Sequence, residues 1–183
     1  MTPTDSETIS LADLGAGLPA ITPSFGMALA EAGAICLTDC GHKAKVLLTV
    51  NGDFAATFLI DWPDVTEQMR HCWNDEDVAT EHGAYGLACL LILRLTDFTI
   101  IERSRRGTGF DYWVGYKDSD AEELFSNKAR LEVSGIRIGD DTLIRQRLRK
   151  KIKQIQRSGG LSLPGYVVVV EFGRPKSQVV KRV

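Results

Sequence analysis

The order of hydrophobic and polar positions predicts three helices and six strands. Apolar residues recur at helical spacing within 23–41, 80–95 and 140–158. Apolar runs or alternating patterns typical of strands occupy 45–50, 54–62, 99–102, 110–114, 129–136 and 166–172. Residues 1–10, the acidic connector 63–79 and the basic tail 173–183 are polar, and we expect them to lie outside these elements, apart from one helical turn in the connector.

The N-terminal part of the pattern is a helix followed by a two-stranded ribbon. Asn51-Gly52 lies between the two strands and is the strongest short-range signal for a hairpin. An isolated hairpin is marginally stable in water, so this ribbon should extend or cap a larger sheet. We therefore predict that residues 1–79 form an N-terminal extension of a core made by residues 80–183, the two together forming one compact domain.

The pattern predicts that the core contains, in order, a helix, three strands, a second helix and a fourth strand. Short loops join the three consecutive strands, which should run antiparallel, whereas a helix joins 129–136 to 166–172 and implies a parallel pair with a right-handed crossover. The continuous apolar run Tyr166–Phe172 is typical of a strand covered on both faces. The predicted fold class is α/β: an α-β-β-β-α-β core with a mixed sheet between two helices, extended by the N-terminal helix and hairpin.

Local signals refine the helix ends. Thr80 is a suitable N-cap for the first core helix, and Glu81 would then lie where the helix dipole favours an acid. Gly83 and Gly86 lower helix stability, so we expect another backbone or a ligand to approach them closely. Gly159-Gly160 is expected to end the second core helix.

Composition places the chain among ordinary globular proteins. It is 183 residues long, 44% hydrophobic and 25% charged. Its first residues lack the basic start and apolar core of a secretory signal, and the apolar helix 84–95 is shorter than the roughly 20 residues that span a bilayer. We therefore expect a cytoplasmic protein without membrane contact.

The cysteines do not indicate a disulfide framework. A zinc site can be imagined from five residues, namely Cys36, Cys40, His42, His71 and Cys72. No pair among them has the CxxC spacing of structural zinc sites, so we favour buried or idle thiols.

The net charge of −2 conceals an asymmetry along the chain. Residues 1–77 carry 12 acidic and three basic side chains, whereas residues 78–183 carry 12 acidic and 19 basic ones. A basic half suggests a polyanionic partner such as nucleic acid. The alternative is that the acidic half docks on the basic half.

Acidic residues on strands that should be buried carry the candidate chemistry. Asp111 and Glu132 belong to consecutive antiparallel strands, so their carboxylates can meet across the ladder. The period of two places Arg130 and Ser134 on the same strand face as Glu132. Burying such acids is costly unless a cation or base pairs with them. We therefore predict a Mg²⁺ or Mn²⁺ site for phosphodiester hydrolysis, with Glu81 as a third oxygen ligand.

Residues 80–172 place Glu81 at the head of a helix, followed by a strand after TDF, the loop RSRRGTG, and the segments FDYW and LEVS. In this order they resemble the PD-(D/E)XK nuclease superfamily. Holliday-junction resolvases and very small restriction-type nucleases are the nearest parallels. The resemblance implies Asp111 as the central metal ligand, Glu132 as the Glu of the E-x-K element and Glu81 as the helix carboxylate. It also implies substrate contacts by Ser104, Arg105 and Arg106.

One position departs from the family pattern. Ser134 stands where the family has a lysine that orients and deprotonates the attacking water, and a hydroxyl cannot supply its charge. Substitutes considered from the sequence are Arg130, Lys128, Arg145 and Gln146. Arginine is a poor base because it stays protonated.

Two hypotheses follow. The first is a metal-dependent nuclease acting on DNA or RNA, whose phosphate contacts are Arg103, Ser104, Arg105, Arg106, Arg145, Arg149 and Lys153. The second is a catalytically inactive nuclease-fold module that binds nucleic acid, or a protein partner through its acidic N-terminal part. A homodimer is left open in both.

Overall fold

The structure, a computed structural model, describes residues 6–120, 123, 125–126, 128–158 and 163–182. Its helices are α1 (Pro23–Asp39), α2 (Glu67–Cys72), α3 (Glu76–Leu95) and α4 (Asp141–Arg157), preceded by a short 3-10 helix at Leu11–Ala16. Its strands are β1 (Thr8–Ser10), β2 (Val46–Gly52), β3 (Ala56–Asp61), β4 (Phe98–Arg103), β5 (Tyr112–Tyr116), β6 (Ala129–Ile136), β7 (Gly165–Glu171) and β8 (Lys176–Arg182).

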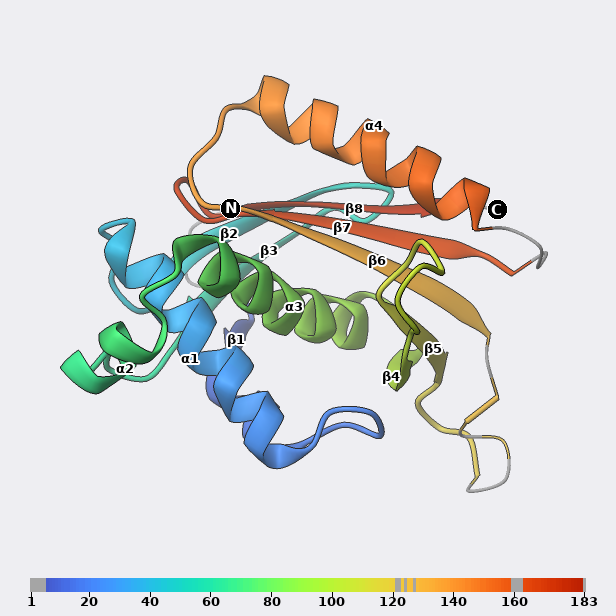
Figure 1. Ribbon diagram of the computed structural model, residues 1–183, viewed down its shortest axis with the longest axis horizontal. Coiled ribbons are helices and arrows are strands. Elements are labelled where there is room, and N and C mark those ends of the chain that lie inside the picture. Colours follow the sequence, from blue (N-terminus) through green and yellow to red (C-terminus); the bar gives the residue numbers. More distant parts are fainter. Residues whose placement is uncertain (1–5, 121–122, 124, 127, 159–162, 183) are drawn as a thin grey trace.

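The strands form one mixed sheet in the order β1-β3-β2-β8-β7-β6-β5-β4. Helix α4 covers one face, and α1 and α3 cover the other (Figure 1). The predicted α/β fold is confirmed, including the parallel β6–β7 pair and the antiparallel β4–β5 and β5–β6 pairs.

The N-terminal extension joins the core through a strand that the sequence analysis missed. The ribbon of β2 and β3 is antiparallel as predicted, although Asn51 and Gly52 end β2 and the turn follows them. The connection is β8, which pairs with β2 on one side and β7 on the other. We had expected this segment to be tail because only Val179 and Val180 give it apolar character. Likewise, β1 buries Ile9 within residues 1–10, for which we predict polar chain outside the elements, and the following 3-10 helix buries Leu11.

Helix α3 begins earlier than predicted. Asp75 is its N-cap, because its side chain accepts hydrogen bonds from the backbone N–H groups of Asp77 and Val78. The prediction that Thr80 caps this helix is therefore wrong: Thr80 is buried one turn inside. Glu81 follows it in the helix and is exposed. The connector also contains α2, in agreement with the predicted helical turn, whereas the predicted stop of α4 at Gly159-Gly160 lies outside the described residues.

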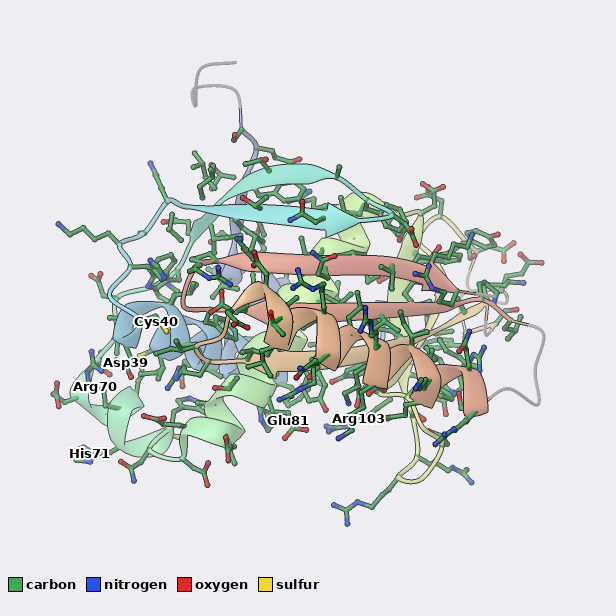
Figure 2. The ribbon with its side chains drawn as sticks, turned by 90° about the horizontal axis from the view of Figure 1, so that it is seen from above. Asp39, Cys40, Arg70, His71, Glu81 and Arg103 are labelled. Carbon is green, nitrogen blue, oxygen red and sulfur yellow. The ribbon has the colours of Figure 1, made fainter. Side chains whose placement is uncertain are left out.

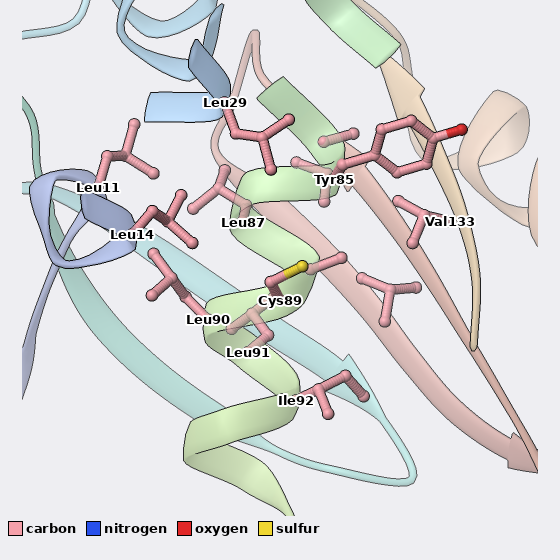
Figure 3. Close-up of a cluster of buried hydrophobic side chains, with 14 of the residues drawn as sticks. Leu11, Leu14, Leu29, Tyr85, Leu87, Cys89, Leu90, Leu91, Ile92 and Val133 are labelled. Carbon is pink, nitrogen blue, oxygen red and sulfur yellow. The ribbon is translucent and has the colours of Figure 1, made fainter. Parts of the chain in front are cut away.

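Helix α3 forms the centre of the larger hydrophobic core. Leu87, Leu91 and Ile92 are fully buried against α1, the 3-10 helix and the sheet (Figure 3). By length and composition α3 could cross a membrane, but 67% of its apolar window is buried inside the protein. Its hydropathy is therefore explained by its central position.

The glycines of α3 allow helix α1 to approach closely, as expected. A Cβ atom on Gly83 would lie 3.0 Å from the backbone N and Cα of Gly33. We predict that Gly83→Val destabilises the protein by about 3 kcal/mol, because its branched side chain must push the two helices apart. Thermal unfolding should show a decrease in Tm of about 6–12 °C. The control Gln146→Val, on an exposed position of α4, should change Tm little, and an equal effect of both variants would contradict the packing argument.

Candidate functional site

The candidate site lies at the start of β5, where the neighbouring strand β6 extends beyond it. Among the described residues, the β5–β6 ladder ends at the pair Tyr112–Leu131, and β6 then runs on to Ile136 paired with β7. At this point Asp111 accepts a hydrogen bond from the backbone N–H of Val133 through Oδ2, at 2.8 Å. The open edge of β6 is the floor of a groove of about 580 Å³ between the start of α3 and α4.

The structure brings together the three predicted metal ligands in this groove. Glu81 from α3, Asp111 before β5 and Glu132 on β6 all line it. The Tyr85 hydroxyl lies 2.8 Å from Glu81 Oε1 and 3.1 Å from Asp111 Oδ1. One hydroxyl carries one proton, so it can donate to one of these carboxylates at a time. In the other contact, two acceptor oxygens face each other, which is unfavourable unless a proton or a cation lies between them.

Tyr85 connects the hydrophobic core to the site. Its ring lies beside the leucines of α3, and its hydroxyl points away from them (Figure 3). Burial and the neighbouring carboxylates of Asp111 and Glu81 raise the pKa of Tyr85 well above its usual value. The hydroxyl therefore stays protonated and acts as a donor.

Glu132 is the most deeply buried acid of the site, with 1% of its surface exposed. Its Oε1 accepts hydrogen bonds from Lys151 Nζ and, at 3.0 Å, from Gln154 Nε2. Its Oε2 is buried and has no hydrogen-bond partner among the described residues. Burial, followed by the nearby charge of Asp111, raises the pKa of Glu132 to about 7 and outweighs the opposing effect of Lys151.

Two features of this cluster are relevant to cation binding. Three carboxylates line the groove, and one of them, Glu132, is paired with the amine of Lys151. Within the described part of the chain, no group of three or more His, Cys, Asp or Glu side chains stands in an arrangement that could hold a metal ion. However, a buried carboxylate oxygen without a partner and two acids sharing one proton are the features that a hard cation satisfies. The oxygen donors are of the kind that Mg²⁺ and Mn²⁺ prefer, but the three carboxylates do not converge on a common point in this structure.

Two further predicted residues of β6 have different surroundings. The Ser134 hydroxyl lines the groove and accepts a hydrogen bond from Arg147 Nη1 at 3.0 Å. Arg130 does not line it. Its guanidinium donates to the backbone carbonyls of Ile155 and Leu163 and to the Ser158 hydroxyl. Arg130 thus fastens the end of α4 to β6, which is a structural task rather than the catalytic one predicted.

The basic loop between β4 and β5 lies next to the carboxylates. Ser104 and Asp111 close it through a backbone hydrogen bond of 2.8 Å. The loop lines a hollow of about 410 Å³ that also contains Glu81, Asp111 and Glu132; its basic and hydroxyl residues there are Arg103, Ser104, Arg105 and Arg106. Figure 2 shows Glu81 and Arg103 on the same side of the molecule. The predicted proximity of this loop to the acids is thus observed.

Of the three predicted contacts on α4, one lines a hollow and two lie on the surface. Lys153 lines a third hollow of about 380 Å³, formed with Gly107, Thr108 and Gly109 of the basic loop. Arg149 is exposed, and Arg145 donates to the Thr142 hydroxyl at 3.2 Å. The structure does not place Arg145 or Arg149 on the lining of these hollows.

Among the described residues, the acidic half of the chain forms no ion pair with the cations of α4. Ion pairs between residues 1–77 and the remainder are Arg94 with Glu7 and Asp13, Arg137 with Asp39, and Arg182 with Asp53. Among the described residues, the cations of α4 form one ion pair, that of Lys151 with Glu132. The basic face of α4 is therefore free to meet a polyanion.

Several site residues were missed by the sequence analysis. Tyr85, Arg147, Lys151 and Gln154 all contact the predicted site residues. The last three lie at helical spacing along the border of the apolar stripe of α4. A position at this border is a weak signal for contact with the sheet, and it does not by itself single out these residues from the other polar residues of α4.

Three residues of the imagined zinc site have other partners. Cys36 donates to the Ala79 carbonyl and Cys40 to the Arg137 carbonyl, through their Sγ atoms. His42 Nε2 lies 2.9 Å from the Phe172 carbonyl oxygen. Burial raises the pKa of Cys36 to about 12, so this thiol stays protonated.

The raised pKa of Glu132 predicts a pH-dependent stability. Its pKa of about 7 lies above the unfolded value of 4.5, so the folded state binds this proton more tightly. The stabilisation is complete below the unfolded pKa and is lost as pH rises through about 7. Glutamine cannot ionise, so the variant Glu132→Gln does not lose this stabilisation. Its free energy of unfolding relative to wild type should therefore rise by on the order of 2–3 kcal/mol when the pH increases from about 5 to about 8. Urea unfolding at both pH values tests this, with exposed Glu102→Gln as control. A stability difference independent of pH would contradict it.

Comparisons with family models, with curated proteins and with solved structures find no match, so the fold and the geometry of this groove are the basis for assigning a function.

Proposed function

We propose that this protein is a Mg²⁺- or Mn²⁺-dependent nuclease that hydrolyses phosphodiester bonds of DNA or RNA. The observation that carries the proposal is the cluster of Glu81, Asp111 and Glu132 in one groove, with a buried oxygen on Glu132 that has no hydrogen-bond partner among the described residues. The predicted PD-(D/E)XK likeness is consistent with this cluster, since its acids come from the predicted helix and the two predicted strand positions. We place this activity in the cytoplasm.

The roles of the side chains follow from their positions. Asp111, Glu132 and Glu81 would hold the cation, which when bound polarises the phosphate and lowers the pKa of a coordinated water. Lys151 is the cationic side chain in contact with these acids, and we assign it the orientation of the attacking water. It would thereby replace the lysine that Ser134 lacks, from a different element of the fold.

The reaction consumes one water per bond. The water oxygen bonds to phosphorus, one P–O ester bond breaks, and the products are a phosphomonoester and a hydroxyl. The leaving oxygen receives a proton, and the proton lost by the water passes to the solvent. Arg103, Arg105, Arg106 and Lys153 would contact neighbouring phosphates, because arginine and lysine stabilise their charge.

The direct test is a cleavage assay of the purified protein with mixed DNA and RNA. We expect fragments in the presence of Mg²⁺ or Mn²⁺ and none with an excess of chelator. Calorimetry with Mn²⁺ alone should detect one binding process. Absence of both cation binding and cleavage would refute the enzyme.

The second candidate is an inactive module that binds nucleic acid, favoured by the serine at position 134. It predicts binding without cleavage, with an affinity that falls steeply as salt rises because phosphate contacts release counterions. Flat salt dependence would point instead to a protein partner at the acidic N-terminal part.

A further inference from the structure

The groove has two walls of opposite charge. On the α4 side, the groove is lined by the cations Arg147, Lys150 and Lys151. The α3 wall supplies Asp77 and Glu81, with Glu76 exposed beside them. From its start at Glu76, α3 contains no lysine or arginine before Arg94. A polyanion in the groove is therefore attracted by one wall and repelled by the other.

The groove, the hollow of the basic loop and the third hollow are neighbours that share lining residues. The groove and the hollow of the basic loop share Glu81, Asp111, Glu132 and Gln154. The loop hollow and the third hollow share Gly107, Gly109 and Gln154. Among the described residues, the charged side chains that line the third hollow are Lys150, Lys153 and Arg157. Positive charge thus follows α4 along these neighbouring hollows, past the carboxylates.

Planar side chains lie near the acidic wall: Arg103 lines the hollow of the basic loop, Tyr85 lines the groove, and further rings of α1 and α3 pack around them. The Arg103 guanidinium lies 5.9 Å from the ring centre of Phe25 and 6.0 Å from that of Tyr85. The His82 ring packs against Phe25 and Trp73, with centroids 6.4 and 5.4 Å apart. Phe25, His82 and Trp73 are each half-buried, so part of their surface is open to solvent. Such groups stack on unpaired bases, whose faces are hidden in a duplex.

We infer that this groove takes a single strand of nucleic acid in preference to a duplex. The backbone of the strand lies along α4, and its bases turn toward Arg103, Phe25 and His82. In a duplex, the second backbone would face the acidic wall at Asp77 and Glu81, and its bases would not reach the planar side chains. The inference rests on the proposed function and adds the substrate class to it.

The test is a binding measurement that does not depend on cleavage. Fluorescence anisotropy of the Asp111→Asn protein at low salt compares one labelled oligonucleotide alone and annealed to its complement. We expect the single strand to bind at least about tenfold more tightly. Equal or tighter binding of the duplex overturns the inference and leaves the proposed nuclease standing. Absence of binding to either form overturns both.

Charge-reversal variants test the cause of the preference. Glu76→Lys with Asp77→Lys should strengthen duplex binding more than single-strand binding and reduce the preference to about threefold or less. The matched control, Asp64→Lys with Glu67→Lys near α2, makes the same charge change and should raise both affinities alike. An unchanged preference in the groove variant, or an equal loss of preference in the control, overturns the role of the acidic wall.

Removal of a planar group tests the contribution of base stacking. His82→Ala should weaken single-strand binding about tenfold and duplex binding little, since base stacking is lost from one form. Its Tm is measured alongside, and Phe25→Leu, which keeps an apolar side chain without a ring, serves as a second variant. Equal weakening of both forms by these variants would overturn the stacking argument.

Discussion

Asp111→Asn is expected to abolish cation-dependent cleavage, with a loss of at least about 10³-fold in rate, equivalent to about 4 kcal/mol of transition-state stabilisation. Asp111 lies at the meeting point of the site: it contacts the Tyr85 hydroxyl, accepts the Val133 N–H and raises the pKa of Glu132. Asparagine keeps the size of the side chain and an oxygen that can accept the Val133 N–H. It removes the charge that a hard cation requires.

Two measurements separate loss of chemistry from loss of fold. Calorimetry with Mn²⁺ should show binding weakened at least about tenfold in Asp111→Asn, whereas its Tm should stay near that of wild type. Asp118→Asn, an exposed aspartate in the loop after β5, is the matched control and should cleave normally. Full activity of Asp111→Asn would exclude the cation site at these acids and, with it, the proposed mechanism.

The fold was predictable wherever hydrophobic periodicity is strong. The run Tyr166–Phe172 and the alternation in Ala129–Ile136 predicted β7 and β6, and the intervening helix predicted their parallel pairing. Strand β8 was not predictable, because its place between β2 and β7 depends on backbone hydrogen bonds that a polar sequence does not reveal. The cap of α3 was missed because both Thr80 and Asp75 are suitable N-caps and tertiary packing decides between them.

The site was predictable as far as strand neighbours determine it. Consecutive antiparallel strands bring Asp111 and Glu132 together, and the period of two fixes the facing of Glu132 and Ser134. The same rule placed Arg130 on the correct face, but it did not reveal that Arg130 reaches the end of α4 instead of the groove. Lys151 could not be selected from the sequence, since the rotation of α4 over the sheet decides which of its many cations meets Glu132.

Lys151→Met is expected to lower the cleavage rate about 10²- to 10³-fold while Mn²⁺ binding persists. Methionine keeps much of the length and the apolar stem of lysine but removes the amine that contacts Glu132. Without this competing cation, Glu132 remains a ligand for the metal, so a loss of rate with retained Mn²⁺ binding identifies Lys151 as a positioning group. Lys150→Met, which removes a neighbouring charge of the groove without a contact to Glu132, should lose less than about fivefold.

Position 134 provides a reciprocal test of the same assignment. A lysine placed there would enter the same groove from β6, in the position where the resembled family carries it. Ser134→Lys combined with Lys151→Met should therefore recover at least about tenfold of the rate lost by Lys151→Met alone, limited by the nearby charge of Arg147. Recovery in the double variant would show that the groove requires an amine beside Glu132, and that either β6 or α4 can supply it. If Lys151→Met cleaves as fast as wild type, the amine has no part in the reaction and contributes only to the charge balance of Glu132.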